Sequence, residues 1–348
     1  MSMLVDRAPY GERDEEAFLA EMNRLTGHHL TACNEYARIW PEWKGAARVD
    51  ELPYLHVGVF KRIEFRSDGK GIKYERTLLS SATTSGTPSR IALDTRSSEL
   101  QARSSLAILG DFVGTSIRPL LILDSARSLR LRGEVSARIA AAMSLRPLAS
   151  DIHFLMESPE VPSSMRWDAL SRLLAEHDNL LVYGFTWILY SAWASAAMPA
   201  EVRSQLAGKT VCFVHSGGWK KLEAVRVSRD AFDGALLSGL SSDSKVIDFY
   251  GLVEQVGVVY PLCEHGFRHA PVWADVLVRD PVSLDALDGE PGLLQLMNVL
   301  AVGAPYHSVL TEDLGRIVPG TCPCGRAGKR FELIGRLPKS EIRGCANV

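Results

Sequence analysis

The chain has 348 residues, of which 46% are hydrophobic and 23% are charged, and its formal net charge is −2. This composition is typical of a globular protein with a large core, and it provides no basic field for nucleic acid or an anionic membrane. Six cysteines in a chain of this length do not indicate a disulfide framework, and the charged N-terminus contains no apolar signal core. We therefore expect a cytoplasmic protein made of one mixed domain or two unequal ones.

The first part of the chain is expected to be helical and then to form an edge strand. Residues 14–40 have apolar side chains at helical spacing. His29 and Cys33 stand four residues apart and share a face, which we interpret as a packed helix face rather than a metal site. Val57–Phe65 has the pattern of an edge strand.

Strands and helices then alternate, which predicts a parallel sheet with helices on its faces. The predicted helices are Ser97–Val113, Arg132–Met143, Trp167–His177, Trp187–Ala197 and Ala200–Leu206. The predicted strands are Arg118–Asp124, Asp151–Met156, Leu180–Tyr183 and Thr210–Val214. Leu180–Met198 carries no charge over 19 residues, but its glycine and serines favour a buried strand–helix unit over a membrane span.

The pattern of predicted elements changes at about Lys245, where short strands and Gly/Pro turns begin to dominate. Predicted strands in this part are Val272–Val278, Gly292–Val299 and Arg330–Ile334. They indicate an antiparallel, barrel-like part next to the parallel sheet.

A cluster of hydroxyl groups around one glycine lies between two apolar segments within residues 78–91. Its centre consists of Thr83, Thr84, Ser85, Gly86 and Thr87. The backbone N–H groups and hydroxyls of such a loop can surround the phosphate chain of a nucleotide. Ordinary solvated turns have the same composition, so the loop alone does not decide between the two interpretations.

Four further motifs follow this loop in a fixed order. Gly217-Gly218 ends a predicted strand and allows the backbone to approach a flat ligand such as a purine. Asp248-Phe249-Tyr250-Gly251, followed by Glu254, offers aromatic rings for a base and a carboxylate for Mg²⁺. Asp313 is a carboxylate of the kind that binds ribose hydroxyls, and Gly335-Arg336 comes last.

Together these motifs resemble those of the adenylate-forming superfamily of acyl- and aryl-acid ligases. Thr84-Ser85-Gly86-Thr87 is similar to the phosphate-loop motif, although Pro88-Ser89-Arg90 stands where the superfamily has a second glycine and a lysine. The other matching segments are Tyr250-Gly251-Leu252-Val253-Glu254, Thr311-Glu312-Asp313-Leu314-Gly315 and Gly335-Arg336. The resemblance implies an α/β fold, the large N-terminal domain of these ligases, with two α/β subdomains and a barrel-like part. It also implies that ATP and Mg²⁺ are used, with Glu254 holding the magnesium ion.

Within the superfamily, the chain is most similar to acyl-protein synthetases of the LuxE type, followed by phenylacetate-CoA-ligase-like relatives. Phe60-Lys61, Gly217-Gly218-Trp219-Lys220 and Arg343-Gly344-Cys345 carry this resemblance. Typical superfamily members continue after the Gly-Arg motif into a mobile C-terminal domain with a catalytic lysine. We expect residues 1–60 to form an N-terminal segment of the main domain and 61–335 the adenylate-forming core. In residues 336–348, the C-terminal domain is then reduced to a short tail.

The tail carries a cysteine close to its end. A thiolate is a good acceptor for an activated carboxyl group, and a segment without an apolar anchor can bring it to the site. The resemblance implies self-acylation at a cysteine near the C-terminus, which matches Cys345 in position. The alternative is a terminal cysteine without a role.

Positive charge is needed where the missing domain would have supplied its lysine. Lys220 or Lys221, directly after the glycine pair, can balance the charge that develops on the α-phosphate. The alternative interpretation is that both lysines are solvated residues at the end of a strand and have no catalytic role. Arg336 is included among the catalytic candidates through the Gly-Arg motif of the resemblance.

Cysteines and histidines form a second group of interest near the C-terminal part. Cys263, His269, Cys322 and Cys324 have the donor types of a structural zinc site, and phenylacetate-CoA-ligase-like relatives look similar here. Cys322-Pro323-Cys324 is tighter than the usual zinc spacing, so a zinc site and unrelated turns both remain open.

The sequence thus predicts an enzyme that activates a carboxylic acid, with a fatty acid as the first choice, to acyl-AMP and transfers the acyl group to Cys345. Onward transfer would go to a partner reductase, a carrier protein or CoA. One alternative is a stand-alone aryl- or acyl-CoA ligase. Another is a degenerate nucleotide-binding scaffold that regulates a partner.

Overall fold

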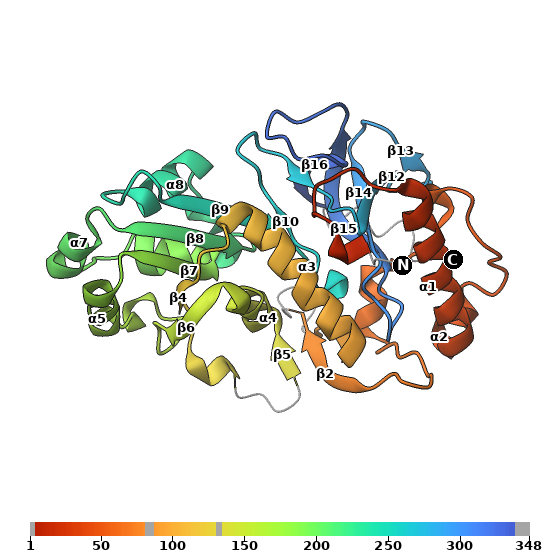
Figure 1. Cartoon of the computed structure of the whole chain (residues 1–348), viewed down its shortest axis with the longest axis horizontal. Coiled ribbons are helices and arrows are strands. Elements are labelled where there is room, and N and C mark those ends of the chain that lie inside the picture. Colours follow the sequence, from red (N-terminus) through yellow and green to blue (C-terminus); the bar gives the residue numbers. More distant parts are fainter. Residues whose placement is uncertain (1–3, 81–86, 130–133, 338–348) are drawn as a thin grey trace. The chain divides into compact units, whose positions relative to one another are not determined.

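The computed structural model describes residues 4–80, 87–129 and 134–337. The chain divides into two compact units, and Figure 1 labels most of their helices and strands. Unit 1 consists of Met1–Ile108 and Gly251–Val348, and unit 2 consists of Leu109–Tyr250. The division falls inside helix α3 (Thr95–Val113), which matches the predicted helix closely.

Unit 2 is built around a parallel sheet whose strands lie in the order β9-β8-β7-β4-β6 (Figure 1). Its strands are β4 (Arg118–Ile122), β6 (Ala149–Phe154), β7 (Asn179–Phe185), β8 (Thr210–Ser216) and β9 (Lys245–Tyr250). The helices of the unit are α4 (Ala137–Met143), α5 (Trp167–Glu176), α6 (Thr186–Leu189), α7 (Ala200–Leu206) and α8 (Arg229–Leu237). Strand β4 is buried throughout, as expected for a parallel strand covered on both faces. The predicted alternation of strands and helices is therefore confirmed.

Two predicted helices of unit 2 are shorter than expected. The helix expected over Arg132–Met143 begins at Ala137, because Ser136 ends strand β5 (Glu134–Ser136) and its hydroxyl accepts the Ile139 N–H. The helix expected over Trp187–Ala197 consists of α6 and a π-helical turn, η7 (Tyr190–Ala194). It ends where the Ser195 N–H and hydroxyl both donate to the Tyr190 carbonyl.

Unit 1 contains an antiparallel sheet in the order β11-β16-β15-β14-β12-β13, with β1 parallel to β15. Its strands are β1 (Leu55–His56), β11 (Arg268–His269), β12 (Ala274–Arg279), β13 (Ala286–Leu287), β14 (Gly292–Asn298), β15 (Ser308–Val318) and β16 (Arg330–Arg336). The unit also contains the short strand β10 (Tyr260–Pro261) and the antiparallel hairpin of β2 (Tyr74–Leu79) and β3 (Arg90–Asp94). The antiparallel character expected for this part of the chain is confirmed.

The N-terminal helical region of unit 1 forms as predicted, in two pieces. Helix α1 (Glu15–Ala32) begins where the Asp14 carboxylate accepts the Ala17 N–H, and α2 (Asn34–Ile39) follows after one extended residue. The short 3₁₀ helices of the chain are η1 (Leu4–Asp6), η2 (Val49–Glu51), η3 (Val57–Lys61), η4 (Ala126–Leu129), η5 (Arg146–Leu148), η6 (Pro162–Ser164), η8 (Lys220–Val225) and η9 (Val253–Gln255). No helix among the described residues is long and apolar enough to cross a membrane.

The edge strand predicted over Val57–Phe65 is wrong. The chain forms the 3₁₀ helix η3 there instead. The Gly58 N–H donates to Nδ1 of His56, and the Ile63 N–H donates to the Val59 carbonyl at 2.9 Å. These local hydrogen bonds satisfy the backbone groups that a strand would have paired with a neighbour.

Buried histidines connect α1 to the segment between β14 and β15. His29 Nε2 donates to the Ala301 carbonyl at 3.0 Å, so Nδ1 accepts from the Ser67 hydroxyl at 2.7 Å. His307 stacks on His29 at a centroid distance of 5.0 Å and pairs with Thr26. Burial, with a contribution from His28, lowers the pKa of His307 from 6.5 to about 3. The interpretation of His29 as part of a packed helix face is confirmed.

These neutral histidines predict a loss of stability in weak acid. The unfolded chain takes up a proton below the ordinary His307 pKa of 6.5, whereas the folded chain does so only near 3. The contribution of neutral His307 to the free energy of unfolding is therefore fully present above pH 6.5. It decreases as the pH is lowered, by about 2 kcal/mol at pH 5. The free energy of unfolding, measured with urea above pH 6.5 and at pH 5, should decrease less between the two conditions for His307→Gln than for wild type. The half-exposed control His177→Gln should behave like wild type, and an unchanged pH dependence in His307→Gln would contradict this assignment.

Candidate active site

The hydroxyl-rich loop joins β2 and β3, which pair as a hairpin up to Leu79 and Arg90. The Ser80 N–H donates to the Ser89 carbonyl at 3.1 Å, and the Ser89 N–H donates to Oγ of Ser80 at 2.8 Å. The two ends of the loop are therefore held together. Thr83, Thr84, Ser85 and Gly86 lie outside the described residues, and Thr87 is exposed.

In unit 2, the predicted site residues gather at the carboxyl ends of the neighbouring parallel strands β8 and β9, next to the end of β7. Phe185 at the end of β7 is paired in register with Ser216 of β8, which is paired with Phe249 of β9. Gly217 and Gly218 directly follow β8. The carboxyl edge of an open parallel sheet is the usual location of ligand sites in such folds.

The glycine pair after β8 depends on the absence of a side chain. Gly217 has a φ of 78°, a backbone conformation that residues other than glycine rarely adopt. The Thr186 hydroxyl donates to the Gly217 carbonyl at 2.6 Å and lies 2.9 Å from Nδ1 of His215. Thr186 and His215 thus hold the turn in place, although the sequence assigned no role to either residue.

The three predicted residues of β9 have different environments. Asp248 is partly exposed, and its Oδ1 lies 4.0 Å from Nδ1 of His215. The ring of Phe249 stacks against Tyr183 at a centroid distance of 6.5 Å and is buried in the core. Tyr250, the last residue of β9, is 9% exposed and lies nearer the sheet edge. Both rings are buried, and Tyr250 is the one at the carboxyl end of the strand.

In unit 1, a buried carboxylate forms the centre of a second group of predicted residues. Glu254 lies in η9 and is only 4% exposed. Burial raises its pKa, and the neighbouring Asp313 acts in the same direction. The Ser89 hydroxyl and the Lys61 ammonium oppose this rise, although Ser89 Oγ makes no hydrogen bond of ordinary geometry in the described part of the chain. Lys61 and Ser89 were not predicted as site residues.

The chemistry of this group fits a hard cation. A carboxylate removed from water is stabilised when a positive charge approaches it, and Mg²⁺ prefers oxygen ligands of this type. Glu254 is the residue that would hold Mg²⁺, and Asp313 is a second carboxylate in its electrostatic range. Gly251, which precedes η9, is exposed.

Asp313 and Arg336 face each other as a register pair between β15 and β16. Arg336 donates to Oε2 of Glu312 at 2.8 Å, and its Nε lies 4.0 Å from Oδ1 of Asp313. The strand pair shifts register between Leu314 and Gly315. A Cβ on Gly315 would lie 2.6 Å from the Glu332 carbonyl oxygen, so glycine is required at this shift.

The other predicted residues are placed as follows. Lys220 begins η8 after the glycine pair, but its side chain lies outside what the structure describes. Cys345 lies outside the described residues as well. Cys263, His269, Cys322 and Cys324 come together in unit 1, with their donor atoms within 4.8 Å of one another.

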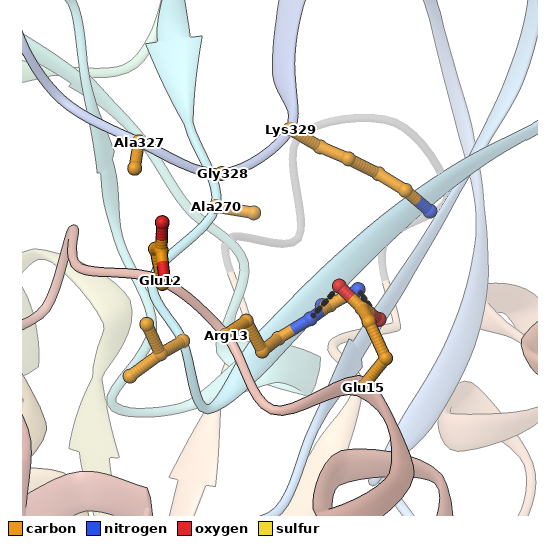
Figure 2. A pocket seen from close by; sticks show the side chains of 8 residues that line it. Glu12, Arg13, Glu15, Ala270, Ala327, Gly328 and Lys329 are labelled. Carbon is orange, nitrogen blue, oxygen red and sulfur yellow. Dashed lines mark hydrogen bonds and ion pairs between the residues drawn. The ribbon is translucent and has the colours of Figure 1, made fainter.

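A pocket of about 320 Å³ lies in unit 1 between the start of α1 and the segments that follow His269 and Cys324 (Figure 2). Arg13 and Lys329 line it, and both form ion pairs with the fully buried Asp275 at 3.0 Å. Arg13 is also bound to Glu15, as Figure 2 shows. The positive charges of this pocket are therefore already neutralised, and none of the predicted site residues lines it.

Solved structures with the same fold are ligases crystallised with acyl adenylates. A 2-hydroxyisobutyryl-CoA ligase with 2-HIB-AMP and CoA in the thioesterification state matches 96% of this chain and 71% of its own, with a TM-score of 0.67 and 16% identity. An open conformation of the enzyme matches 92% of this chain and 74% of its own, with a TM-score of 0.65 and 14% identity. The chain therefore has the fold of the large N-terminal domain of adenylate-forming ligases.

The family model described as "Acyl-protein synthetase, LuxE" matches residues 11–348. The chain belongs to this family. It is also similar to the long-chain-fatty-acid–luciferin-component ligase of Vibrio harveyi, with 25% identity over 209 residues. That match covers 59% of this chain and 53% of the relative, which is about half of its length. The resemblance to acyl-protein synthetases that the sequence indicated is confirmed at the level of the family.

Proposed function

We propose that the protein is an AMP-forming ligase that activates a carboxylic acid and transfers the acyl group to its own Cys345. The chain belongs to the LuxE family, and one observation in its structure gives the main support for the proposal. Motif residues far apart in the sequence gather at two places that suit a nucleotide and its metal: the carboxyl edge of the parallel sheet, and the surroundings of Glu254.

The first step makes the mixed anhydride. A carboxylate oxygen of the acid attacks the α-phosphorus of ATP, and the bond between the α-phosphorus and the bridging oxygen breaks. The products are acyl-AMP and pyrophosphate. When bound, Mg²⁺ neutralises charge on the phosphate oxygens.

The predicted site residues have the following roles in this step. Thr84, Ser85 and Thr87 hold the phosphates through their hydroxyls and N–H groups, and Glu254 holds the metal ion. Tyr250 packs against adenine above the turn at Gly217 and Gly218, and Asp313 accepts hydrogen bonds from the ribose. Lys61 is a positive charge in electrostatic range of Glu254. Lys220 balances the charge on the α-phosphate.

The second step moves the acyl group to sulfur. The thiolate of Cys345 attacks the acyl carbon, the carbon–oxygen bond to AMP breaks, and AMP leaves with the electron pair of that bond. The thiol proton passes to solvent. The product is a thioester on the protein, from which a partner reductase or a carrier protein takes the acyl group.

A long-chain fatty acid is the first candidate substrate. The support comes from the Vibrio harveyi relative, which is named for its action on such acids. The protein is proposed to act in the cytoplasm, with ATP and Mg²⁺ as the species it needs.

The neutral variant Glu254→Gln should reduce acid-dependent exchange between ATP and pyrophosphate by about 100-fold, because it keeps the shape of the side chain but removes the metal-binding charge. Since burial raises the pKa of Glu254, ionisation of this carboxyl costs stability as the pH rises through the folded pKa. The melting temperature of Glu254→Gln at neutral pH should therefore not fall. The exposed control Glu290→Gln should leave exchange unchanged, and full exchange in Glu254→Gln would rule out the magnesium role.

Intact-mass analysis after incubation with ATP, Mg²⁺ and a panel of fatty and aromatic acids should show one acyl adduct on the wild-type chain. Cys345→Ser should lose the adduct and keep the ATP–pyrophosphate exchange, since only the second step requires the thiol. Cys212→Ser changes a buried cysteine of unit 2 and serves as the control that keeps the adduct.

Two outcomes would favour the other candidate functions. Full CoA thioester formation by Cys345→Ser, with no labelled wild-type protein, would identify a stand-alone acyl-CoA ligase. No exchange with any fatty or aromatic acid would favour a nucleotide-binding scaffold.

Lys220→Ala should slow adenylate formation by about 10- to 100-fold if this lysine balances the charge on the α-phosphate. The neighbouring variant Lys221→Ala tests the other candidate, and Lys70→Ala changes an exposed lysine of a turn in unit 1 as the control. Single-turnover formation of acyl-AMP is the measurement. If Lys220→Ala and Lys221→Ala both match wild type, neither lysine has this role.

A further inference from the structure

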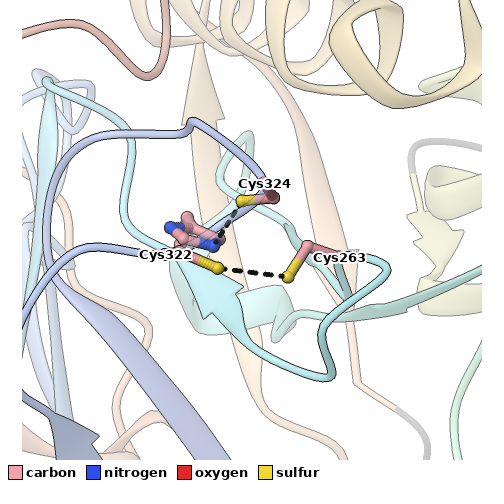
Figure 3. Close-up of side chains that lie close together, drawn as sticks. Cys263, Cys322 and Cys324 are labelled. Atoms are coloured by element: carbon pink, nitrogen blue, oxygen red, sulfur yellow. Dashed lines mark hydrogen bonds between the residues drawn. The ribbon is translucent and has the colours of Figure 1, made fainter.

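Two segments of unit 1 bring three cysteines and one histidine to one point. Cys263 follows β10, and His269 lies in β11. Cys322 and Cys324 belong to the connection between β15 and β16, more than fifty residues further along the chain. Figure 3 shows the three sulfur atoms directed toward one another. All four donor atoms lie within 4.8 Å of one another.

The distances between these donors match the edges of a tetrahedral metal site. Zinc–sulfur bonds of about 2.3 Å and zinc–nitrogen bonds of about 2.0 Å give tetrahedral edges of about 3.8 Å between sulfurs and about 3.5 Å between sulfur and nitrogen. The Cys263 and Cys322 Sγ atoms are 3.9 Å apart, and Cys324 Sγ lies 3.3 Å from His269 Nε2. A disulfide would require sulfurs separated by about 2.05 Å, so Cys263 and Cys322 are not oxidised to one another.

The backbone around two of the cysteines forms tight turns. The Cys263 N–H donates to the Phe267 carbonyl at 2.8 Å, which closes the turn after β10. Each turn is closed by a glycine three residues after its cysteine. Gly266 and Gly325, with φ of 81° and 78°, donate to the carbonyls of Cys263 and Cys322. These tight turns fix the backbone on which both cysteines are carried.

The cluster is also shielded from water. His269 is fully buried and Cys263 is 1% exposed, whereas Cys324 is the more accessible donor. The ring of Tyr10 packs edge-on against His269 at a centroid distance of 6.1 Å. Four protein donors in a closed, buried arrangement are characteristic of a structural site, because a catalytic zinc keeps one position for water or substrate.

We propose that Cys263, His269, Cys322 and Cys324 bind one structural Zn²⁺ that ties the β10–β11 turn to the β15–β16 connection. Three thiolates and one imidazole in tetrahedral arrangement are donors that suit zinc. His269 is paired in register with Arg330 at the start of β16, so the ion fixes the β11–β16 edge of the sheet. This role is independent of the proposed acid activation.

Metal analysis of the full chain, purified without chelator, tests the proposal directly. Wild type should contain about one zinc per chain, and Cys324→Ser should contain much less because one of four ligands is lost. The control Cys212→Ser removes a buried cysteine of unit 2 and should keep the zinc of wild type. The proposal is overturned if wild type holds almost no zinc even after incubation with zinc, if Cys324→Ser retains it, or if iron or copper is found instead.

A second measurement uses the wild-type chain alone, in case Cys324→Ser fails to fold. Cobalt exchanged into the site should give the absorption of a tetrahedral thiolate complex, and a spectrum without thiolate-to-cobalt charge transfer would overturn the proposal. Removal of the metal with a chelator should increase hydrogen exchange of amides in β11 and β16 while leaving β8 unchanged. Equal exchange with and without metal would overturn the structural role. Neither readout uses ATP or an acid, so each can fail while the proposed function stands.

Discussion

The parallel register of β7, β8 and β9 is the constraint on which the nucleotide side of the candidate site depends. Because Phe185, Ser216 and Phe249 are in register, the chain leaves three neighbouring strands at one edge. A shift of one residue in β9 would exchange the directions of Phe249 and Tyr250, which point to opposite faces of the strand. The same register brings Thr186, after β7, next to the turn after β8, where its hydroxyl bonds to the Gly217 carbonyl. Packing in the core thus determines which aromatic ring is left at the edge.

Unit 1 contributes a different physical element, a carboxylate kept out of water. Glu254 is held where its charge is unfavourable, with Asp313 adding repulsion and Lys61 adding attraction. Such an arrangement favours the binding of a positively charged ligand, because the bound ligand stabilises the buried carboxylate. In the proposed function that ligand arrives with ATP, which connects binding of the nucleotide to relief of an electrostatic cost.

Much of the fold and part of the site could be predicted from the sequence. The alternation of strands and helices and the loop between β2 and β3 follow from local patterns. The donor types of Cys263, His269, Cys322 and Cys324 left a zinc site and unrelated turns both open, and the structure brings the four residues together. The 3₁₀ helix η3 could not be predicted, because a hydrogen bond to the His56 ring outweighs the alternation of side chains. Lys61 and Ser89 lie more than 160 residues from Glu254 in the sequence, and no local pattern predicts that they influence its pKa. The inward direction of the Phe249 ring depends on packing against Tyr183, which only the tertiary structure reveals.

The end of β16 sets a limit on where chemistry at the tail can take place. Arg336 is anchored by its pairing with Asp313 and its ion pair with Glu312, so it is a fixed point from which the remaining chain extends. Cys345 is nine residues further along, and a chain of that length spans at most about 30 Å whatever its conformation. Every acyl carbon that Cys345 can reach lies inside a sphere of that radius around Arg336. In the proposed transfer to Cys345, confinement of this kind would replace a bimolecular encounter with a local concentration on the order of millimolar.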